Sequence, residues 1–339
     1  MNNPHNNSIA RTDAGTFGGW LRLAFCLLAL VAATAASAGS RFSSVVVFGD
    51  SLSDTGRLYQ LTNGGFPPRI AYFNGRQSNG HVWVEYLAES LKLENRLQNY
   101  AVVGAMTGPS VSVPTGNVWS GTYLGLEGTS LSGQLSRYLA ERGGSIDPDA
   151  LYLIGGGGND LIGPLSGGGG DINAIIYQLV TNVATIAGTL KQMGAQHIAV
   201  VNVPDFGKTP RLAAYGPVLA GQVSWLVGVV NSYVAGALNG IDSFGGNKIA
   251  RIDAFGFIGG VVAAPASFGF TNVTGAFMTL DMGSNTVAYA APKPNAVKQW
   301  FFWDDLHPTT RGHRSFAENA YMTLKVAFPD AFTGSKDDE

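Results

Sequence analysis

Cysteine is nearly absent from this sequence. Cys26 is the single one among 339 residues, and it lies in an apolar stretch near the N-terminus. One cysteine cannot form a disulfide within the chain, and it offers no Cys-x-x-Cys pair for a structural zinc site. A domain of about 300 residues buries enough apolar surface to be stable without such links. We therefore expect a domain that depends on its hydrophobic core.

Charged residues are also scarce. They make up 13% of the chain, the formal net charge is −2, and no basic cluster is present. Nucleic-acid binding depends on Lys and Arg concentrated along the phosphates, so the composition argues against nucleic acid as a partner.

The motifs of metal and nucleotide sites are missing as well. The sequence has no His-Glu-x-x-His pair and no acidic calcium loop, and His81, His197 and His313 lack partners at ligand spacing. The glycine runs at 155–158 and 167–170 lack the Lys-Ser or Lys-Thr of a phosphate-binding loop, and we expect them to be mobile loops. The sequence predicts neither a metal nor a cofactor.

The first 38 residues have the pattern of an export signal. An apolar run at 23–36 follows Arg22 and ends in Ala-Ser-Ala at 36–38, the small-x-small form of a signal-peptidase site. The run is shorter than the roughly 20 residues that span a bilayer, and no later segment looks long and uninterrupted enough to do so. We predict a signal peptide over 1–38, a single domain over 39–339, and a secreted or periplasmic protein.

Short apolar runs alternate with longer segments of helical periodicity. Strand candidates lie at 45–48, 97–102, 151–154, 197–203 and 249–252. Helix candidates lie at 81–92, 130–142, 172–193 and 210–239, with a further helix beginning near Thr309. This alternation is typical of a parallel sheet covered on both faces, which binds ligands at the carboxyl ends of its strands. The sequence predicts an α/β protein with three layers, α/β/α, around a five-stranded parallel sheet.

A serine follows the first strand candidate. Residues 45–48 are apolar, and Ser51 comes three positions later, after Gly49 and Asp50. A serine hydroxyl is a poor nucleophile unless a base removes its proton during the attack, and that base needs an acid to fix its tautomer.

A base and an acid occur together far downstream. His307 and Asp304 stand three positions apart, and Pro308 follows. The residue before a proline is disfavoured in a helix, so we expect a loop that directs both side chains at the sheet. The pattern predicts nucleophilic acyl chemistry.

Four short blocks occur in the order found in the GDSL or SGNH hydrolases, which this sequence resembles from about residue 43 to about residue 328. The blocks are FGDSLSDTG at 48–56, NYAVVGA at 99–105, GGND at 157–160 and DDLHP at 304–308. Two further segments, NGRQSNG at 74–80 and FWD at 302–304, are similar to the branch with secreted lipases, phospholipases, lipid acyltransferases and thermolabile haemolysins.

The resemblance implies a role for each residue. Ser51 would attack the ester carbonyl, His307 would accept and return the proton, and Asp304 would hold the imidazole. The resemblance assigns the oxyanion hole to the backbone N–H groups of Ser51 and Gly104 and to the side-chain amide of Asn159. It also implies the SGNH hydrolase version of the flavodoxin-like fold.

Simpler interpretations exist for some of these positions. Ser51 could cap a following helix, and Asn159 and Asp160 could be turn formers. Asp305 competes with Asp304 as the partner of the histidine, and the spacing in the family pattern favours Asp304.

Three further stretches could shape the site. Residues 105–128, with Trp119 and Tyr123, and residues 254–300 look like loop excursions that form either ordinary surface or an apolar acyl-binding wall. Residues 74–76 could shape its entrance.

The sequence therefore predicts an exported serine esterase or lipase that cleaves lipid or short-chain acyl esters through an acyl-enzyme. Its partner would be a small-molecule or lipid ester, with transient contact to a lipid surface and no obligate protein partner. The alternatives are a lipid acyltransferase, a polysaccharide acetylesterase, and a non-catalytic exported binding protein.

Overall fold

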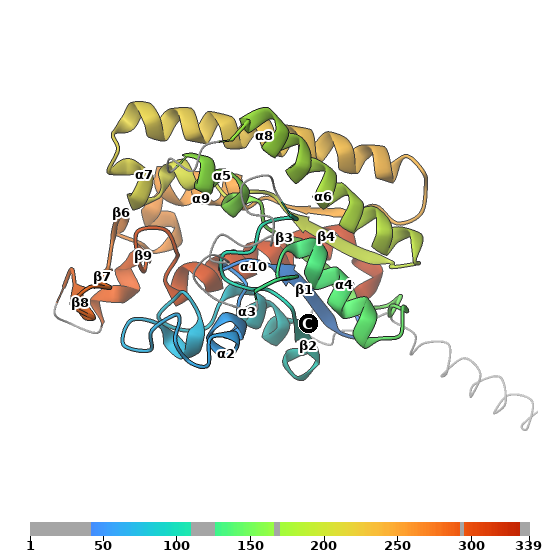
Figure 1. Cartoon of the computed structure of the whole chain (residues 1–339), viewed down its shortest axis with the longest axis horizontal. Coiled ribbons are helices and arrows are strands. Elements are labelled where there is room, and N and C mark those ends of the chain that lie inside the picture. The colour runs from blue at the N-terminus through green and yellow to red at the C-terminus, as the bar shows by residue number, and fades with distance from the viewer. Residues whose placement is uncertain (1–41, 110–125, 166–169, 292–294, 333–339) are drawn as a thin grey trace, which may run out of the picture. The chain divides into compact units, whose positions relative to one another are not determined.

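A five-stranded parallel sheet lies at the centre of the structure, with the strand order β2-β1-β3-β4-β5 (Figure 1). The strands are β1 Val45–Gly49, β2 Leu97–Asn99, β3 Leu151–Gly155, β4 His197–Val201 and β5 Ala250–Ile252. This computed structural model describes residues 42–109, 126–165, 170–291 and 295–332. All five strand candidates are confirmed. The predicted leader lies outside the described residues, as do Trp119 and Tyr123.

Helices cover both faces of the sheet, as predicted. On one face, Val46, Phe48 and Tyr152 belong to the largest hydrophobic cluster, which also includes buried side chains of three helices. These helices are α4 Leu131–Glu141, α6 Ile172–Gln192 and α8 Pro217–Asp242. On the other face, α3 Trp83–Ser90 packs against α10 Thr310–Ala327 (Figure 1). Alternate strand residues point to opposite faces, so β1 is buried on both sides.

The segment predicted as one helix over 210–239 is two. α7 Pro210–Ala213 ends before Gly216, which has a φ of 92°, and α8 begins at Pro217. A left-handed glycine followed by a proline at the first helical position stops one helix and starts the next.

α8 is also long and apolar enough to cross a bilayer by length and composition. The expectation that no segment after the leader has these properties is therefore wrong. In this structure Val223, Val227 and Val230 of α8 pack into the hydrophobic core, so we assign the helix to the domain.

The stretch at 254–300 contains regular structure that the sequence interpretation missed. It comprises α9 Ala254–Ala263, β6 Asn272–Ala276, β7 Met278–Asp281 and β8 Thr286–Tyr289. β6 pairs in parallel with β9 Trp300–Phe302, and β7 pairs with β8 in an antiparallel hairpin. Two short helices, α2 Arg57–Leu61 and α5 Gly158–Gly163, were also not predicted. The remaining elements are 3-10 turns at Phe73–Gly75, Glu94–Arg96, Phe206–Lys208, Pro265–Phe268, Ala296–Gln299 and Pro329–Ala331.

Candidate active site

Ser51 lies in a tight turn at the carboxyl end of β1. The carbonyl of Asp50 accepts hydrogen bonds from the N–H groups of Ser53 and Asp54, both at 3.0 Å. A Cβ on Gly49 would lie only 3.0 Å from the Cβ of Ser53, so the chain needs a glycine to leave the strand at this angle. Ser51 is buried, with 8% of its surface exposed.

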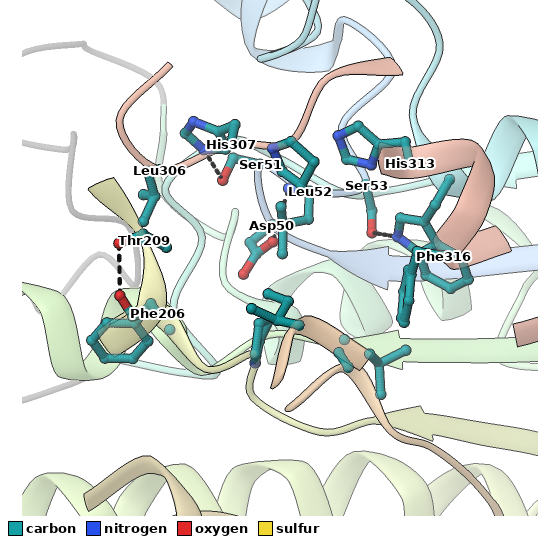
Figure 2. A pocket seen from close by; sticks show the side chains of 18 of the residues that line it. Asp50, Ser51, Leu52, Ser53, Phe206, Thr209, Leu306, His307, His313 and Phe316 are labelled. Carbon is teal, nitrogen blue, oxygen red and sulfur yellow. Dashed lines mark hydrogen bonds between the residues drawn. The ribbon is translucent and has the colours of Figure 1, made fainter. Parts of the chain in front are cut away.

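The structure brings His307 and Asp304 to this serine. The Nε2 atom of His307 lies 2.9 Å from the Oγ atom of Ser51, and its Nδ1 atom lies 2.9 Å from Oδ2 of Asp304. Both residues come from the loop between β9 and α10, as predicted. The chain of hydrogen bonds from carboxylate to imidazole to hydroxyl is therefore continuous. Figure 2 shows the contact between His307 and Ser51.

The carboxylate of Asp304 is held by more than the histidine ring. Its Oδ1 atom accepts the N–H groups of Leu306 and His307 at 2.8 and 2.6 Å, and its Oδ2 atom accepts the hydroxyl of Tyr72 at 2.8 Å. Burial alone would raise the pKa of Asp304, but His307 and these backbone donors lower it to about 2. Burial and the charge of Asp304 raise the pKa of Tyr72, which therefore remains a donor. No motif had indicated Tyr72.

Asp305 does not compete for the imidazole. Its carboxylate accepts two hydrogen bonds from the guanidinium of Arg211, at 2.9 and 2.7 Å. The geometry therefore favours Asp304 as the partner of His307.

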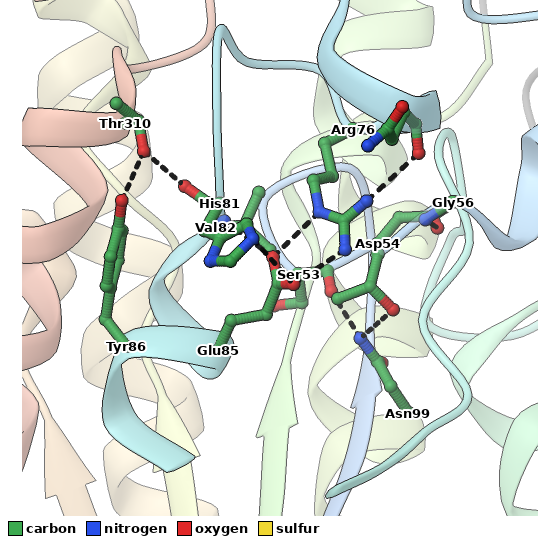
Figure 3. A network of polar contacts seen from close by, with 12 residues as sticks. Ser53, Asp54, Gly56, Arg76, His81, Val82, Glu85, Tyr86, Asn99 and Thr310 are labelled. Carbon is green, nitrogen blue, oxygen red and sulfur yellow. Dashed lines mark hydrogen bonds and ion pairs between the residues drawn. The ribbon is translucent and has the colours of Figure 1, made fainter. Parts of the chain in front are cut away.

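The loop that carries His307 is anchored by the segment at 74–80. The hydroxyl of Ser78 donates to the carbonyl of Pro308 at 3.0 Å, and Oδ1 of Asn79 accepts the N–H of Thr310 at 2.8 Å. Thr310 also lies 2.5 Å from the hydroxyl of Tyr86 on α3 (Figure 3).

The entrance role predicted for residues 74–76 is not seen, because none of the three lines the cavity beside Ser51. Arg76 instead forms an ion pair of 2.6 Å with Glu85 in the first turn of α3 (Figure 3).

The predicted oxyanion donors lie on three segments that follow strands of the sheet. Within the described part of the chain, no acceptor is recorded for the N–H groups of Ser51 and Gly104. Gly104 has a φ of 79°, which a residue with a side chain rarely adopts. Nδ2 of Asn159 donates one hydrogen to the carbonyl of Ala105 at 2.9 Å, and an amide has a second hydrogen to give.

The glycine run at 155–158 is ordered rather than a mobile loop. Gly155 ends β3, Gly158 begins α5, and Asn159 and Asp160 lie in the first turn of that helix. The simpler interpretation of these two residues as turn formers is therefore wrong.

Two buried carboxylates hold the segment around Gly104. Asp54 accepts the N–H of Val103 at 2.8 Å, and Asp160 accepts both the N–H and the hydroxyl of Thr107, the latter at 2.7 Å. Burial raises the pKa of Asp54, and it raises that of Asp160 to about 7 despite the hydrogen bonds from Thr107. The sequence interpretation had given neither residue this role.

A cavity of about 950 Å³, which includes its open mouth, lies beside Ser51 and His307 (Figure 2). Its walls are mainly apolar, and Asn159 lines it while Gly104 does not. The apolar lining includes Trp83, Ile162, Pro204, Phe206, Phe257 and Phe316. Figure 2 shows Phe206 and Leu306 on one side of Ser51, and His313 and Phe316 on the other.

No group of three or more His, Cys, Asp or Glu side chains in the described ranges could hold a metal ion. His197 begins β4, and its ring packs edge-on against Phe42 and Phe328 at centroid distances of 4.9 and 5.2 Å. His313 lies in α10, as predicted, and lines the cavity.

Comparison with known proteins places this chain among esterases, lipases and acyltransferases. Residues 45–320 match the family model described as GDSL-like lipase/acylhydrolase. The chain is 26% identical to a phosphatidylcholine-sterol acyltransferase of Aeromonas hydrophila, over 89% of this chain and 97% of the relative. It is 26% identical to a thermolabile hemolysin of Vibrio parahaemolyticus, over 84% of this chain and 64% of the relative.

The chain is also 29% identical to the esterase EstA of Pseudomonas aeruginosa, over 90% of this chain but only 50% of the relative. Among solved structures, it is similar to LAE5, an alpha/beta hydrolase from the metagenome of Lake Arreo, with 12% identity and a TM-score of 0.47. That likeness covers 84% of this chain and 95% of the solved one, and it is too distant to bear on function.

Proposed function

Because this chain belongs to the GDSL-like lipase/acylhydrolase family and is an ester hydrolase, we propose that it cleaves lipid or short-chain acyl esters through an acyl-enzyme on Ser51. The observation that carries the proposal is the continuous chain of hydrogen bonds from Asp304 through His307 to Ser51. An imidazole in hydrogen-bond contact with a serine hydroxyl on one side and a carboxylate on the other can act as a general base.

In the proposed reaction, Oγ of Ser51 attacks the ester carbonyl while Nε2 of His307 takes its proton. Asp304 keeps Nδ1 protonated and stabilises the imidazolium. The oxyanion accepts hydrogen bonds from the N–H groups of Ser51 and Gly104 and from the free amide hydrogen of Asn159. The imidazolium then protonates the leaving alcohol, and a water molecule releases the acid by the same steps in reverse. No cofactor takes part.

The cavity supports an acyl group or alcohol with a substantial apolar part. Phe206 and Phe316 line it on opposite sides of Ser51, and Trp83 also belongs to its lining. Such walls can remove a hydrocarbon chain from water, which favours binding in proportion to the area buried. They are less suited to a strongly hydrated polysaccharide, so an acetylated polysaccharide is the less favoured substrate.

Transfer of the acyl group to an alcohol is the second candidate reaction. The observation that favours it is the similarity to an acyltransferase over 97% of that relative's length. Any alcohol that reaches the acyl-enzyme faster than water would give transfer instead of hydrolysis.

We further propose that residues 1–38 are a cleaved leader and that the protein acts after export, on a small-molecule or lipid ester. The support is the apolar run followed by Ala-Ser-Ala at 36–38. N-terminal sequencing of protein from the medium or periplasm should give a chain that starts at about residue 39. Recovery of only the full-length chain from the cytoplasm would contradict the proposal.

The catalytic proposal is tested with a fluorophosphonate probe and a panel of nitrophenyl esters from acetyl to palmitoyl. We expect one label per chain, on Ser51, and no label on a folded Ser51→Ala variant. A folded wild-type protein that takes up no label would favour a non-catalytic binding protein. Adding a phospholipid and an acetylated xylan to the panel separates the substrate classes, and turnover of the xylan alone would show that the preference for lipid esters is wrong.

A further inference from the structure

Asp50 places a carboxylate in the wall of the cavity next to the nucleophile. Only 7% of its surface is exposed, and the residue lines the same cavity as Ser51 and His307. Figure 2 shows its carboxylate directed into the space beside Ser51. The proposed mechanism gives this group no task.

One oxygen of this carboxylate accepts a hydrogen bond from the main chain of the turn, and the other faces the cavity. Oδ1 accepts the N–H of Leu52 at 3.0 Å. For Oδ2, no donor is recorded among the residues that the structure describes. The other buried carboxylates near the site are better satisfied, since Asp54 accepts four backbone N–H groups and Asp304 accepts a tyrosine hydroxyl as well as two N–H groups and the imidazole.

A carboxylate oxygen that faces a cavity accepts hydrogen bonds from whatever occupies that cavity, whether water or a ligand. Burial raises the pKa of Asp50 to about 6, although the N–H of Leu52, the charge on His307 and the residue's own N–H act in the opposite direction. Above that pH the group is mainly an anion. His307 and Asp160 are the titratable groups that interact with it, and His313 also lines the cavity.

A structural role in the turn explains only one of the two carboxylate oxygens of Asp50. An aspartate that accepts the N–H two residues later forms a common local turn, and one oxygen is enough for that purpose. The second oxygen points into a cavity whose other lining is mainly apolar, so a donor on a bound ligand would meet few competing acceptors.

We propose that Asp50 accepts a hydrogen bond from a hydroxyl group of the substrate that lies close to the scissile ester. The ligand class is therefore an ester of a hydroxylated acid or a partial ester of a polyol. This inference deepens the proposed function and rests on it, because the cavity must be the ester-binding site. Asp50, Ser51 and His307 line the same cavity, so we expect the hydroxyl to lie near the carbonyl under attack.

Two matched pairs of esters distinguish the two sources of the hydroxyl. 4-Nitrophenyl 3-hydroxybutyrate and 4-nitrophenyl butyrate differ on the acyl side. Glycerol monobutyrate and propyl butyrate differ on the alcohol side. At pH 7.5 we expect kcat/KM to favour the hydroxylated member of one pair by at least about tenfold, because its hydrogen bond to a charged acceptor is stronger than one to a neutral group.

The variant Asp50→Asn keeps the size of the side chain and an acceptor for Leu52, but it removes the charge. We expect the preference to fall to about twofold or less, mainly through a higher KM for the hydroxylated ester. The control Asp149→Asn removes an exposed carboxylate just before β3, at the opposite edge of the sheet, and should keep the wild-type preference. Both variants are first checked for their melting temperature.

A second measurement needs no variant. In the wild-type protein the preference should decline as the pH is lowered from 7.5 to 5, because Asp50 becomes protonated and loses its charge. Equal rates within both pairs, or a preference that neither the variant nor the pH changes, would overturn the inference. If none of the four esters is turned over, the proposed function fails instead.

Discussion

At the scale of single residues, the site depends on the pair Asp304 and His307. The carboxylate lies 2.9 Å from Nδ1 of the imidazole, and its pKa of about 2 means that it is ionised at neutral pH. The adjacent Asp305 has a separate partner in Arg211. Two neighbouring aspartates therefore have distinct tasks.

We predict that Asp304→Asn lowers kcat by roughly 1,000- to 10,000-fold while the protein stays folded, because the imidazole is no longer held in the productive tautomer. Asp305→Asn should lower it far less. The comparison is made by steady-state kinetics on a nitrophenyl ester. Equal losses in both variants would mean that the assignment of the acid is wrong.

Tyr72 is the residue that sequence reasoning could not find. Its hydroxyl meets Asp304 from 232 positions away, and tyrosine carries no spacing pattern of its own. We predict that Tyr72→Phe lowers kcat by about tenfold, with little change in KM, because it removes one charged hydrogen bond that orients the carboxylate. An unchanged kcat would show that the backbone donors alone fix Asp304.

At the scale of elements, the turn after β1 organises its surroundings through Asp54. This side chain is fully buried and accepts the N–H groups of Gly56, Arg57, Leu58 and Val103. It therefore joins the start of α2 to the segment that carries Gly104.

We predict that Asp54→Ala lowers the free energy of unfolding by about 2–4 kcal/mol, because several buried N–H groups lose their acceptor. Asp54→Asn, which keeps one acceptor oxygen, should cost less. Urea denaturation followed by tryptophan fluorescence measures both. A loss below about 0.5 kcal/mol for the alanine variant would show that water replaces the carboxylate.

The strands and the long helices were predictable because their periodicity is local. β1 and β3 are continuous apolar runs, which a sheet buried on both faces requires. The failures have two different causes, one local and one not. The break at Gly216 depends on one backbone angle, and β6 and β9 form a sheet only because Asn272 and Trp300, far apart in sequence, lie side by side.

The three central residues of the site were predictable from the sequence, but the residues that hold them in place were not. Ser51, Asp304 and His307 meet as the short motifs indicated. The groups that hold the site, such as Tyr72 and Asp160, were not assigned these roles, because their contacts form only when distant segments come together.

At the scale of the whole molecule, two buried ionisable groups have opposite effects on how stability depends on pH. Asp160 lowers stability as the pH rises, and His313 lowers it as the pH falls. Asp160 has its pKa raised from 3.8 to about 7, so the folded state binds its proton more tightly and loses stability as the pH rises through that window. His313 has its pKa lowered by burial from 6.5 to about 3, so it costs stability as the pH falls through that range.

We predict that the free energy of unfolding of the wild type, relative to Asp160→Asn, decreases between pH 4 and pH 8, by on the order of 4 kcal/mol. Relative to His313→Gln, the free energy of unfolding of the wild type should decrease as the pH falls from 7 towards 3. Chemical denaturation at several pH values gives both differences. A flat difference for either variant would show that the group does not titrate differently on unfolding.

Ser51 and His307, the proposed nucleophile and base, are 256 positions apart, and His307 belongs to the loop just before the last long helix. During synthesis the polypeptide therefore carries an ordinary, unreactive alcohol until nearly the whole domain has left the ribosome. Chains that terminate before this loop should therefore be unable to cleave esters. Ser51 becomes activated only once the loop has packed against the sheet.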